Sequence, residues 1–238
     1  MYLMQAILLC GGLSTRLGNI TKKTPKILLP IGNRLIIDYQ INLLKTANVT
    51  EIVLASGHLH EVIFKHIGYQ YKGLRVSYAK EDKRLGTGGA IKNAMNYITS
   101  EPFFTLNGDI LAEGVNLYEM LNYHDEIEHN INGKIDGLIL SSFVEDIREF
   151  GEIVSGQNGR VLNFKEKQQK MKSGYINGGI YLFKQTIRNY FPEQDVFSVE
   201  YDVFPSVSQL YAFQSQAELI DVGVPERLEY ARQKFFLC

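Results

Sequence analysis

The chain has 238 residues, 45% of them hydrophobic and 21% charged, which is typical of a soluble globular protein with one large domain or two small ones. Its net charge of −1 argues against a general nucleic-acid binder, and no apolar run reaches the roughly 18–20 residues that span a bilayer. The N-terminus has no basic region before its apolar run, and Cys10 and Cys238 lie far apart, so we expect no signal peptide and a cytoplasmic location.

Charge is distributed unevenly along the chain. Residues 1–100 contain 13 Lys and Arg against 5 Asp and Glu, whereas residues 101–238 contain 12 against 21. A basic N-terminal half suits a site for small polyanions, although an ordinary solvated basic surface would give the same count.

The first conspicuous stretch runs from Gln5 to Lys26. Ala6–Leu9 is a short apolar run that predicts a buried parallel strand. The residues after it favour phosphate binding through backbone N–H groups, hydroxyls and cations: Gly11, Gly12, Ser14, Thr15, Arg16 and Lys26. The stretch matches neither G-x-G-x-x-G nor G-x-x-x-x-G-K-[ST], and an ordinary strand-to-helix turn is the alternative interpretation.

Strand and helix patterns alternate over the next eighty residues. We expect an extended segment at Ile27–Pro30, helices at Leu35–Ala47, His60–His66 and Gly86 to about Ile98, and strands at Glu51–Ala55, Leu74–Ala79 and Phe103–Leu106. This alternation predicts an α/β fold with a mostly parallel sheet and helices on both faces. Ligands in such folds bind at the carboxyl ends of the strands, where Gly11-Gly12 and Asp109 both fall.

The second half is richer in strand patterns. We expect strands at Ile135–Ser142, Tyr175–Phe183 and Ala217–Val222, a hairpin of Gly151–Ser155 and Arg160–Phe164, an exposed insertion at Lys165–Ser173, helical patterns at Gln185–Tyr190 and from Ser198, and a closing helix at Pro225–Phe236. Two glycines inside the strand 175–183 indicate a bulge or a close ligand. Without a repeat or linker, residues 1–238 are expected to form a single domain with a mixed sheet.

Two carboxylates, Asp109 and Asp221, each follow an apolar run and have a glycine nearby. Two carboxylates together with substrate phosphates suffice for Mg²⁺, because this ion keeps several of its waters. Either aspartate alone would be read as a helix cap or turn residue. Beside a phosphate-binding loop, the pair predicts a Mg²⁺ site.

The sequence resembles the sugar-1-phosphate nucleotidyltransferases. The resemblance rests on motifs in the expected order along nearly the whole chain: LLCGGLSTRLGNITKKTPKILLPI (8–31), LGTGGAI (85–91), NGD (107–109), FG (150–151), EK (166–167), INGGIYLF (176–183), FSVE (197–200) and DVGVPE (221–226). It implies a Rossmann-like fold with a β-rich sugar-binding insertion, in which about 1–110 bind the nucleotide and about 111–238 the sugar. It also implies a reaction of an NTP with a sugar 1-phosphate that releases pyrophosphate.

The resemblance assigns roles residue by residue. Arg16 would hold the β- and γ-phosphates, Lys26 would lie at the α-phosphate, and Mg²⁺ would bind Asp109 and Asp221. The nucleotide would be bound by Leu9, Gly11, Gly12, Ser14, Thr15, Glu81, Gly86, Thr87, Gly88, Asn107 and Gly108. Among these, Gly88 would offer a backbone donor, and Glu81 would face the base edge. The sugar phosphate would be bound by Gly151, Glu166, Lys167, Asn177, Gly178 and Glu200.

The motifs look closest to those of the D-glycero-α-D-manno-heptose 1-phosphate guanylyltransferases, which implies GTP as the nucleotide. Mannose-1-phosphate guanylyltransferases and the muramate- or glucose-1-phosphate uridylyl-, thymidylyl- and cytidylyltransferases share the same skeleton and remain alternatives. The chain departs from the common pattern at Ser14, where many relatives carry glycine, at Gln168 after Glu-Lys, and at Val224 after Asp-x-Gly. These changes leave open the local shape around the sugar.

Two other classes of protein are compatible with parts of the sequence. A non-catalytic nucleotide-sensing subunit of the same fold is disfavoured because Arg16, Lys26, Asp109 and Asp221 are all present. A dinucleotide-dependent oxidoreductase is disfavoured because the G-x-G-x-x-G motif is missing. Aromatic residues near the C-terminus (Tyr230, Phe235 and Phe236) fit either the core or a subunit interface, so a homo-oligomer stays open.

Overall fold

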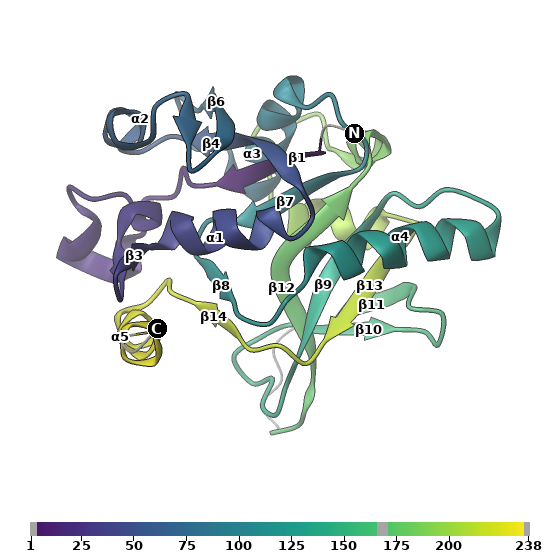
Figure 1. Ribbon diagram of the computed structural model, residues 1–238. Coiled ribbons are helices and arrows are strands. Elements are labelled where there is room, and N and C mark those ends of the chain that lie inside the picture. Colours follow the sequence, from purple (N-terminus) through teal and green to yellow (C-terminus); the bar gives the residue numbers. More distant parts are fainter. Residues whose placement is uncertain (1–3, 166–170, 236–238) are drawn as a thin grey trace.

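The computed structural model describes residues 4–165 and 171–235 and is organised around one ten-stranded mixed sheet (Figure 1). Its central strands are parallel and lie in the order β7 (Phe103–Asn107), β1 (Met4–Leu9), β4 (Val49–Ser56) and β6 (Leu74–Lys80). The short β5 (Gln70–Tyr71) closes that edge. β1, β4 and β7 are apolar over most of their length, as expected for strands that helices cover on both faces.

The other side of the sheet is mostly antiparallel. The long strand β12 (Gly174–Phe183) pairs with β7 through its second half and with β9 (Gly137–Val144) through both ends. The remaining strands of this side are β13 (Leu210–Ser215), parallel to β9, and the hairpin of β10 (Glu152–Ser155) and β11 (Val161–Lys165). One continuous sheet therefore contains strands from both halves of the chain.

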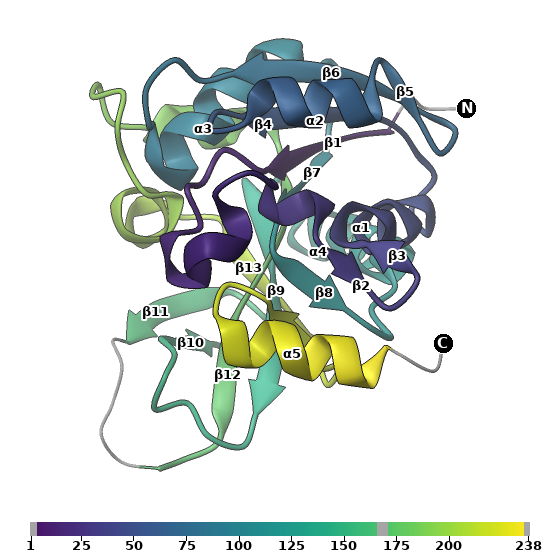
Figure 2. The same ribbon diagram turned by 90° about the vertical axis from the view of Figure 1, so that its left-hand side faces the viewer.

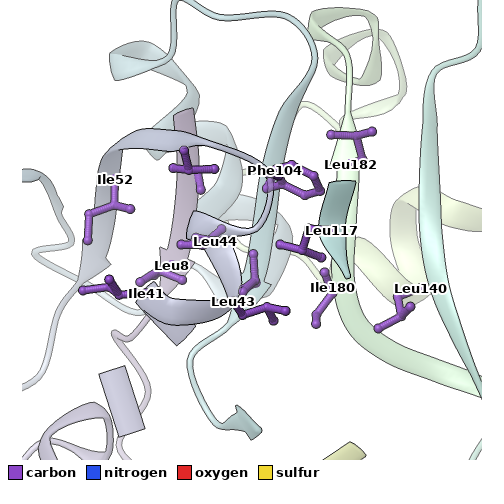
Figure 3. Close-up of a cluster of buried hydrophobic side chains, with 14 of the residues drawn as sticks. Leu8, Ile41, Leu43, Leu44, Ile52, Phe104, Leu117, Leu140, Ile180 and Leu182 are labelled. Atoms are coloured by element: carbon purple, nitrogen blue, oxygen red, sulfur yellow. The ribbon is translucent and has the colours of Figure 1, made fainter. Parts of the chain in front are cut away.

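Helices cover the two faces of the sheet with two separate apolar clusters. On one face lie α1 (Ile36–Lys45), α2 (His60–Ile67) and α4 (Leu117–Ile131), and α3 (Gly86–Ala94) lies on the other. Successive residues of β1 serve opposite faces, since Leu8 belongs to the first cluster and Ile7 to the second. Figure 3 shows the first cluster, which includes Leu8, Ile41, Leu44 and Phe104. Burying each such side chain contributes about 1.5–3 kcal/mol.

A third apolar cluster joins the two ends of the chain. It lies between α5 (Pro225–Lys234) and two small sheets, β2–β3 (Pro30–Ile31 and Arg34–Leu35) and β8–β14 (Ile110–Ala112 and Leu219–Asp221). Figure 2 shows α5 running across the molecule below β2 and β8. Leu17 from the N-terminal loop and Leu228 from α5 are both buried in this cluster. The packing holds the N-terminal loop that contains Leu17 against β14, the strand that ends in Asp221.

The predicted fold class is confirmed, and so are most of the predicted elements. The two interior glycines of β12 do mark a bulge, since the register with β9 shifts between Asn177 and Tyr181 and Gly179 has a φ of +67°. The insertion predicted at 165–173 lies partly outside the described residues, at 166–170. Phe235 is buried and packs against Tyr39, whereas Tyr230 is exposed.

Other expectations were wrong or incomplete. The extended segment expected at Ile27–Pro30 is a 3-10 turn at Lys26–Leu28, because the N–H of Leu28 bonds to the carbonyl of Pro25. The helical patterns at Gln185–Tyr190 and from Ser198 are a 3-10 and a π-helical turn. We assigned nothing to 117–131, although Leu117, Met120 and Ile127 are spaced as in an amphipathic helix, and we also missed β13. Within the described residues, no helix is both long and apolar enough to cross a membrane.

Candidate active site

The carboxylates of Asp109 and Asp221 come together at one point of the fold. Asp109 follows β7 and immediately precedes β8, and Asp221 ends β14, which pairs with β8 so that Asp221 lies opposite Ile110. The N–H of Val222 donates to the carbonyl of Asp109 at 2.9 Å, which joins the two loops directly. Burial and the charge of Asp109 raise the pKa of Asp221. The fold thus holds two like charges next to each other.

Two cations lie beside this pair. Lys26 Nζ is 2.6 Å from Asp109 Oδ2, and the lysine side chain is only 15% exposed. The Arg16 guanidinium lies beside Gly223, since a Cβ on that glycine would be 2.8 Å from Arg16 Nη2. The charges of Lys26 and Arg16 act on Asp221 against the rise in its pKa. Residues from both ends of the chain and from the middle therefore meet in one charged cluster.

A cavity of about 280 Å³ opens at the carboxyl ends of β1 and β7. Its lining includes Leu9, Gly11, Gly12, Asn107, Gly108 and Asp109. Nothing lies within 4 Å of a Cβ built on Gly12, so the backbone there faces open space. A Cβ on Gly108, in contrast, would lie 2.2 Å from the carbonyl oxygen of Leu9. The first glycine leaves room for a ligand, and the second allows the Asp109 loop to pack on the end of β1.

The loop after Gly12 turns sharply before it reaches Arg16. Ser14 has a φ of +52°, in the left-handed region that glycine adopts most easily, which is a physical reason for the glycine that many relatives carry there. The carbonyl of Ser14 accepts from Leu17 N at 3.0 Å and from Thr21 Oγ1 at 3.0 Å. Thr15 begins the 3-10 helix Thr15–Thr21, which carries Arg16.

Glu81 lines the same cavity beside Gly11. Its Oε1 would be 2.8 Å from a Cβ on Gly11, and its Oε2 accepts from the N–H of Leu85 at 3.4 Å. Burial raises the pKa of Glu81, although the Leu85 N–H acts in the other direction. The exposed Arg84 lines the cavity as well, and we did not predict it. A carboxylate acceptor and a guanidinium donor therefore both line this cavity.

The glycines of the LGTGGA segment are used for packing. Gly86 and Thr87 line the cavity, but the N–H of Gly88 donates to the carbonyl of Phe197 at 3.0 Å. A Cβ on Gly88 would come within 2.3 Å of the Phe197 ring. Our expectation that Gly88 offers a backbone donor to the nucleotide is corrected, because that donor is already bonded inside the protein.

A second cavity, of about 360 Å³, lies between β10, β11, β12 and the turn near residue 200. Gly151, Asn177 and Glu200, which the resemblance assigned to the sugar, line it together with Phe150 and Tyr201. Gly178 is buried instead, since a Cβ there would be 2.8 Å from the carbonyl oxygen of Leu140, so its expected contact with the sugar phosphate is corrected. The predicted pair Glu166 and Lys167 lies outside the described residues.

A third cavity, of about 550 Å³, was not expected from the sequence. Arg16, Arg148, Phe150, Asp221 and Arg227 line it. Arg227 lies over the ring of Phe150 at 5.0 Å and bonds to Glu149, while Arg148 bonds to Asp146. Asp109 lines the first cavity and Asp221 the third, and the third cavity shares Phe150 with the second, so the carboxylate pair belongs to a series of three adjoining cavities.

Gln40 was also missed by the sequence reading. It is 1% exposed and donates from Nε2 to the carbonyls of Asn107 and Ile110, on either side of Asp109, at 3.0 and 3.3 Å. A polar residue on the apolar face of α1 was the available signal. Its contacts show that it holds the loop that carries Asp109.

The donor set fits a divalent cation that keeps its own waters. The described parts of the chain contain no group of three or more His, Cys, Asp or Glu side chains that could hold a metal. Two adjacent carboxylates, one with a pKa raised partly by the other, nevertheless form a site that a divalent cation would neutralise. Substrate phosphates would supply further oxygen ligands.

Comparison with known proteins gives a consistent result. The family model described as "Nucleotidyl transferase" matches residues 5–231. The chain is 31% identical over 234 residues to D-glycero-alpha-D-manno-heptose 1-phosphate guanylyltransferase of Aneurinibacillus thermoaerophilus, covering 97% of this chain and 98% of the relative. It is 34% identical to the protein of the same name from Campylobacter jejuni, with 94% and 96% covered.

A solved structure agrees with this comparison. The crystal structure of HddC from Yersinia pseudotuberculosis complexed with GMP-PN superposes with a TM-score of 0.78 at 30% identity. The match covers 99% of this chain and all of that one.

Proposed function

The chain belongs to the nucleotidyl transferase family, and on that premise we propose that it joins an NTP to a sugar 1-phosphate, giving an NDP-sugar and pyrophosphate. The observation that carries the proposal is the cluster of Lys26, Asp109, Asp221 and Arg16 between two cavities of different chemistry. One cavity suits a nucleotide and the other a polyhydroxylated ring. The reacting phosphates would meet at the cluster.

Positioning and charge neutralisation are the main chemical tasks, because both substrates are anions. An oxygen of the sugar phosphate attacks the α-phosphorus in line, and the bond from that phosphorus to the bridging oxygen of pyrophosphate breaks. Lys26 would neutralise the α-phosphate, and Arg16 would bind the leaving pyrophosphate. Lys167, outside the described residues, would hold the sugar phosphate. A preorganised donor of this kind is worth about 3–4 kcal/mol, or 10²–10³ in rate.

Members of the family generally use a divalent metal, and we propose Mg²⁺ bound by Asp109 and Asp221. Bound there, such a metal would supply positive charge to the phosphate oxygens. Lys26, which bonds Asp109 at 2.6 Å, would orient that carboxylate and keep its negative charge balanced. We also propose that the reaction takes place in the cytoplasm, where the free thiol of Cys10 would remain reduced.

We favour GTP as the nucleotide on chemical grounds. Guanine presents two adjacent donors, N1–H and the N2 amino group, which a single carboxylate such as Glu81 can accept together. Its O6 and N7 are acceptors that suit an arginine such as Arg84. Uracil and thymine offer one ring donor between two carbonyls, so they would use the carboxylate less well. The GMP-PN in the HddC structure supports the same choice.

The sugar is proposed to be D-glycero-α-D-manno-heptose 1-phosphate, after the names of the two relatives. Asn177 and Glu200, which both line the 360 Å³ cavity, would bind ring hydroxyls. Mannose 1-phosphate is the nearest alternative substrate because it differs only in the side chain beyond the ring.

The test is pyrophosphate release with Mg²⁺, with five NTPs crossed against heptose, mannose, glucose and N-acetylmuramate 1-phosphates. Release confined to GTP with the manno-heptose phosphate is the expected result. Release with another pair would keep the reaction and replace the substrate. Nucleotide binding without release from any pair would favour a non-catalytic nucleotide-sensing subunit.

Glu81→Gln tests the choice of base. We expect the KM for GTP to rise about 10- to 100-fold, because the charged acceptor is lost. Since burial raises the pKa of Glu81, lowering the pH should protonate this carboxylate sooner than an ordinary glutamate and raise the KM for GTP. Glu81→Gln should lack this pH dependence, and Asp82→Asn, at the exposed neighbouring position, should behave as wild type. An unchanged GTP KM in Glu81→Gln would refute the assignment.

A further inference from the structure

Thr87 lines one cavity and bonds to a residue that lines the other. It lines the nucleotide-side cavity at the start of α3, where we expected it to bind nucleotide. Its hydroxyl, however, bonds to Oε2 of Glu200 at 2.6 Å, and Glu200 lines the sugar-side cavity. The two residues are 113 positions apart in the chain. A single side chain thus links the walls of two binding sites.

The direction of the hydrogen bonds is determined by the backbone. The N–H of Val199 donates to Thr87 Oγ1 at 3.0 Å, so the threonine hydroxyl accepts there and donates its own proton to Glu200. Ser198 Oγ accepts from the N–H of Glu200 and donates to the same Oε2 at 2.6 Å. Two donors therefore hold one oxygen of Glu200 inside the protein.

The second oxygen of Glu200 is held much less tightly. Its described protein contact is the hydroxyl of Tyr181 at 3.4 Å. Tyr181 is fully buried and accepts from Asn177 Nδ2 at 2.9 Å. Burial, together with the charge of Glu200, holds the pKa of Tyr181 well above its usual range, so this hydroxyl stays protonated and acts as a donor. Oε1 is therefore the oxygen with capacity to accept from a ligand.

We propose that Thr87 is a positioning residue for the sugar, which orients Glu200 so that Oε1 faces a ring hydroxyl of the sugar 1-phosphate. This inference rests on the proposed function, because it takes the cavity lined by Asn177 and Glu200 as the sugar site. It assigns the Thr87 side chain to sugar selection and leaves only its backbone on the nucleotide side. The chain of contacts from Thr87 through Glu200 and Tyr181 to Asn177 would orient both polar groups of that cavity as one unit.

The experiment is steady-state kinetics of Thr87→Val with both substrates varied, using the NTP and sugar 1-phosphate on which the wild type is active. We expect the KM for the sugar phosphate to rise about tenfold, because Glu200 loses a short donor, while the KM for the NTP changes less than twofold. Thr87→Ser, which keeps the hydroxyl, should restore the wild-type value. Thr50→Val, the same substitution at an exposed position of β4, is the control for a general effect on the fold.

Tyr181→Phe is the second variant, needed if Thr87→Val does not fold, and it should also raise the sugar KM because one hydroxyl of the network is removed. A raised NTP KM with an unchanged sugar KM in Thr87→Val would overturn the inference and return Thr87 to nucleotide binding. Wild-type protein that releases no pyrophosphate with any sugar phosphate would overturn the proposed function first, and this inference with it. Active wild type with an unaltered sugar KM in both variants would overturn the inference alone.

Discussion

The two cavities are built by different means. The cavity that we assign to the nucleotide lies at the ends of parallel strands, where the backbone of Gly12 faces open space and Gly108 lets the Asp109 loop pack on β1. In the cavity that we assign to the sugar, side chains orient the polar groups: Asn177 bonds to Tyr181 of its own strand, and Glu200 bonds to Thr87 from a distant segment. Backbone donors have nearly the same geometry whatever the neighbours, whereas side-chain groups must be held by a second set of contacts.

This difference shows where changes in specificity are expected. A phosphate chain is common to all NTPs, so a cavity made of backbone can bind it without regard to the base or the sugar. Ring hydroxyls differ among sugars, and their recognition depends on how Glu200 and Asn177 are oriented. Variants on the two sides should therefore alter different kinetic parameters.

The largest effect is expected at the carboxylate pair of Asp109 and Asp221, where we propose that the two substrates meet. Asp221→Asn should lower kcat roughly 10³-fold for any substrate pair, since it removes a charge that we propose to bind the metal. The protein should remain folded, because the amide can still accept the bond that Gly223 N makes to Asp221 Oδ1 at 2.8 Å. Turnover and far-UV circular dichroism would be measured, with the exposed Asp125→Asn as control. Full activity would contradict the metal assignment.

A smaller effect, confined to one side, is expected from Arg16→Ala. The rate should fall about 10²–10³-fold, because the guanidinium is proposed to stabilise the departing pyrophosphate, while the KM for the sugar phosphate should change only a few-fold. Lys22→Ala, at an exposed position six residues away, controls for loss of positive charge. If the change were confined to the sugar KM, Arg16 would belong to the other cavity.

The smallest effects are expected from a pair of glycine variants on the nucleotide side. Gly108→Ala should lower the free energy of unfolding by about 1–3 kcal/mol, since its Cβ would lie 2.2 Å from the Leu9 carbonyl oxygen. Gly12→Ala should leave stability within about 0.5 kcal/mol, because nothing lies within 4 Å, but should raise the KM for the NTP. Thermal unfolding and kinetics of both variants would distinguish a glycine needed for packing, Gly108, from a glycine needed for ligand binding, Gly12. Equal losses of stability would refute the distinction.

The sequence by itself determined the α/β fold and the edge of the sheet where Gly11, Gly12 and Asp109 lie, because the relevant signals are local. Gly11-Gly12 after an apolar strand and Asp109 after another place both loops at the same edge of a parallel sheet. The bulge in β12 was also predictable, since glycines inside a strand have few other uses. The helix 117–131 was missed although its spacing was visible.

Only the tertiary structure decided which groups are free to bind a ligand. Nothing in LGTGGA indicates that Phe197 takes the N–H of Gly88, or that the Thr87 hydroxyl is directed to Glu200. The cluster of Arg16, Arg148 and Arg227 likewise joins residues from three separate segments. A hydrogen bond depends on distance and direction between atoms, and packing of distant segments sets both, so residue types along the chain do not contain that information.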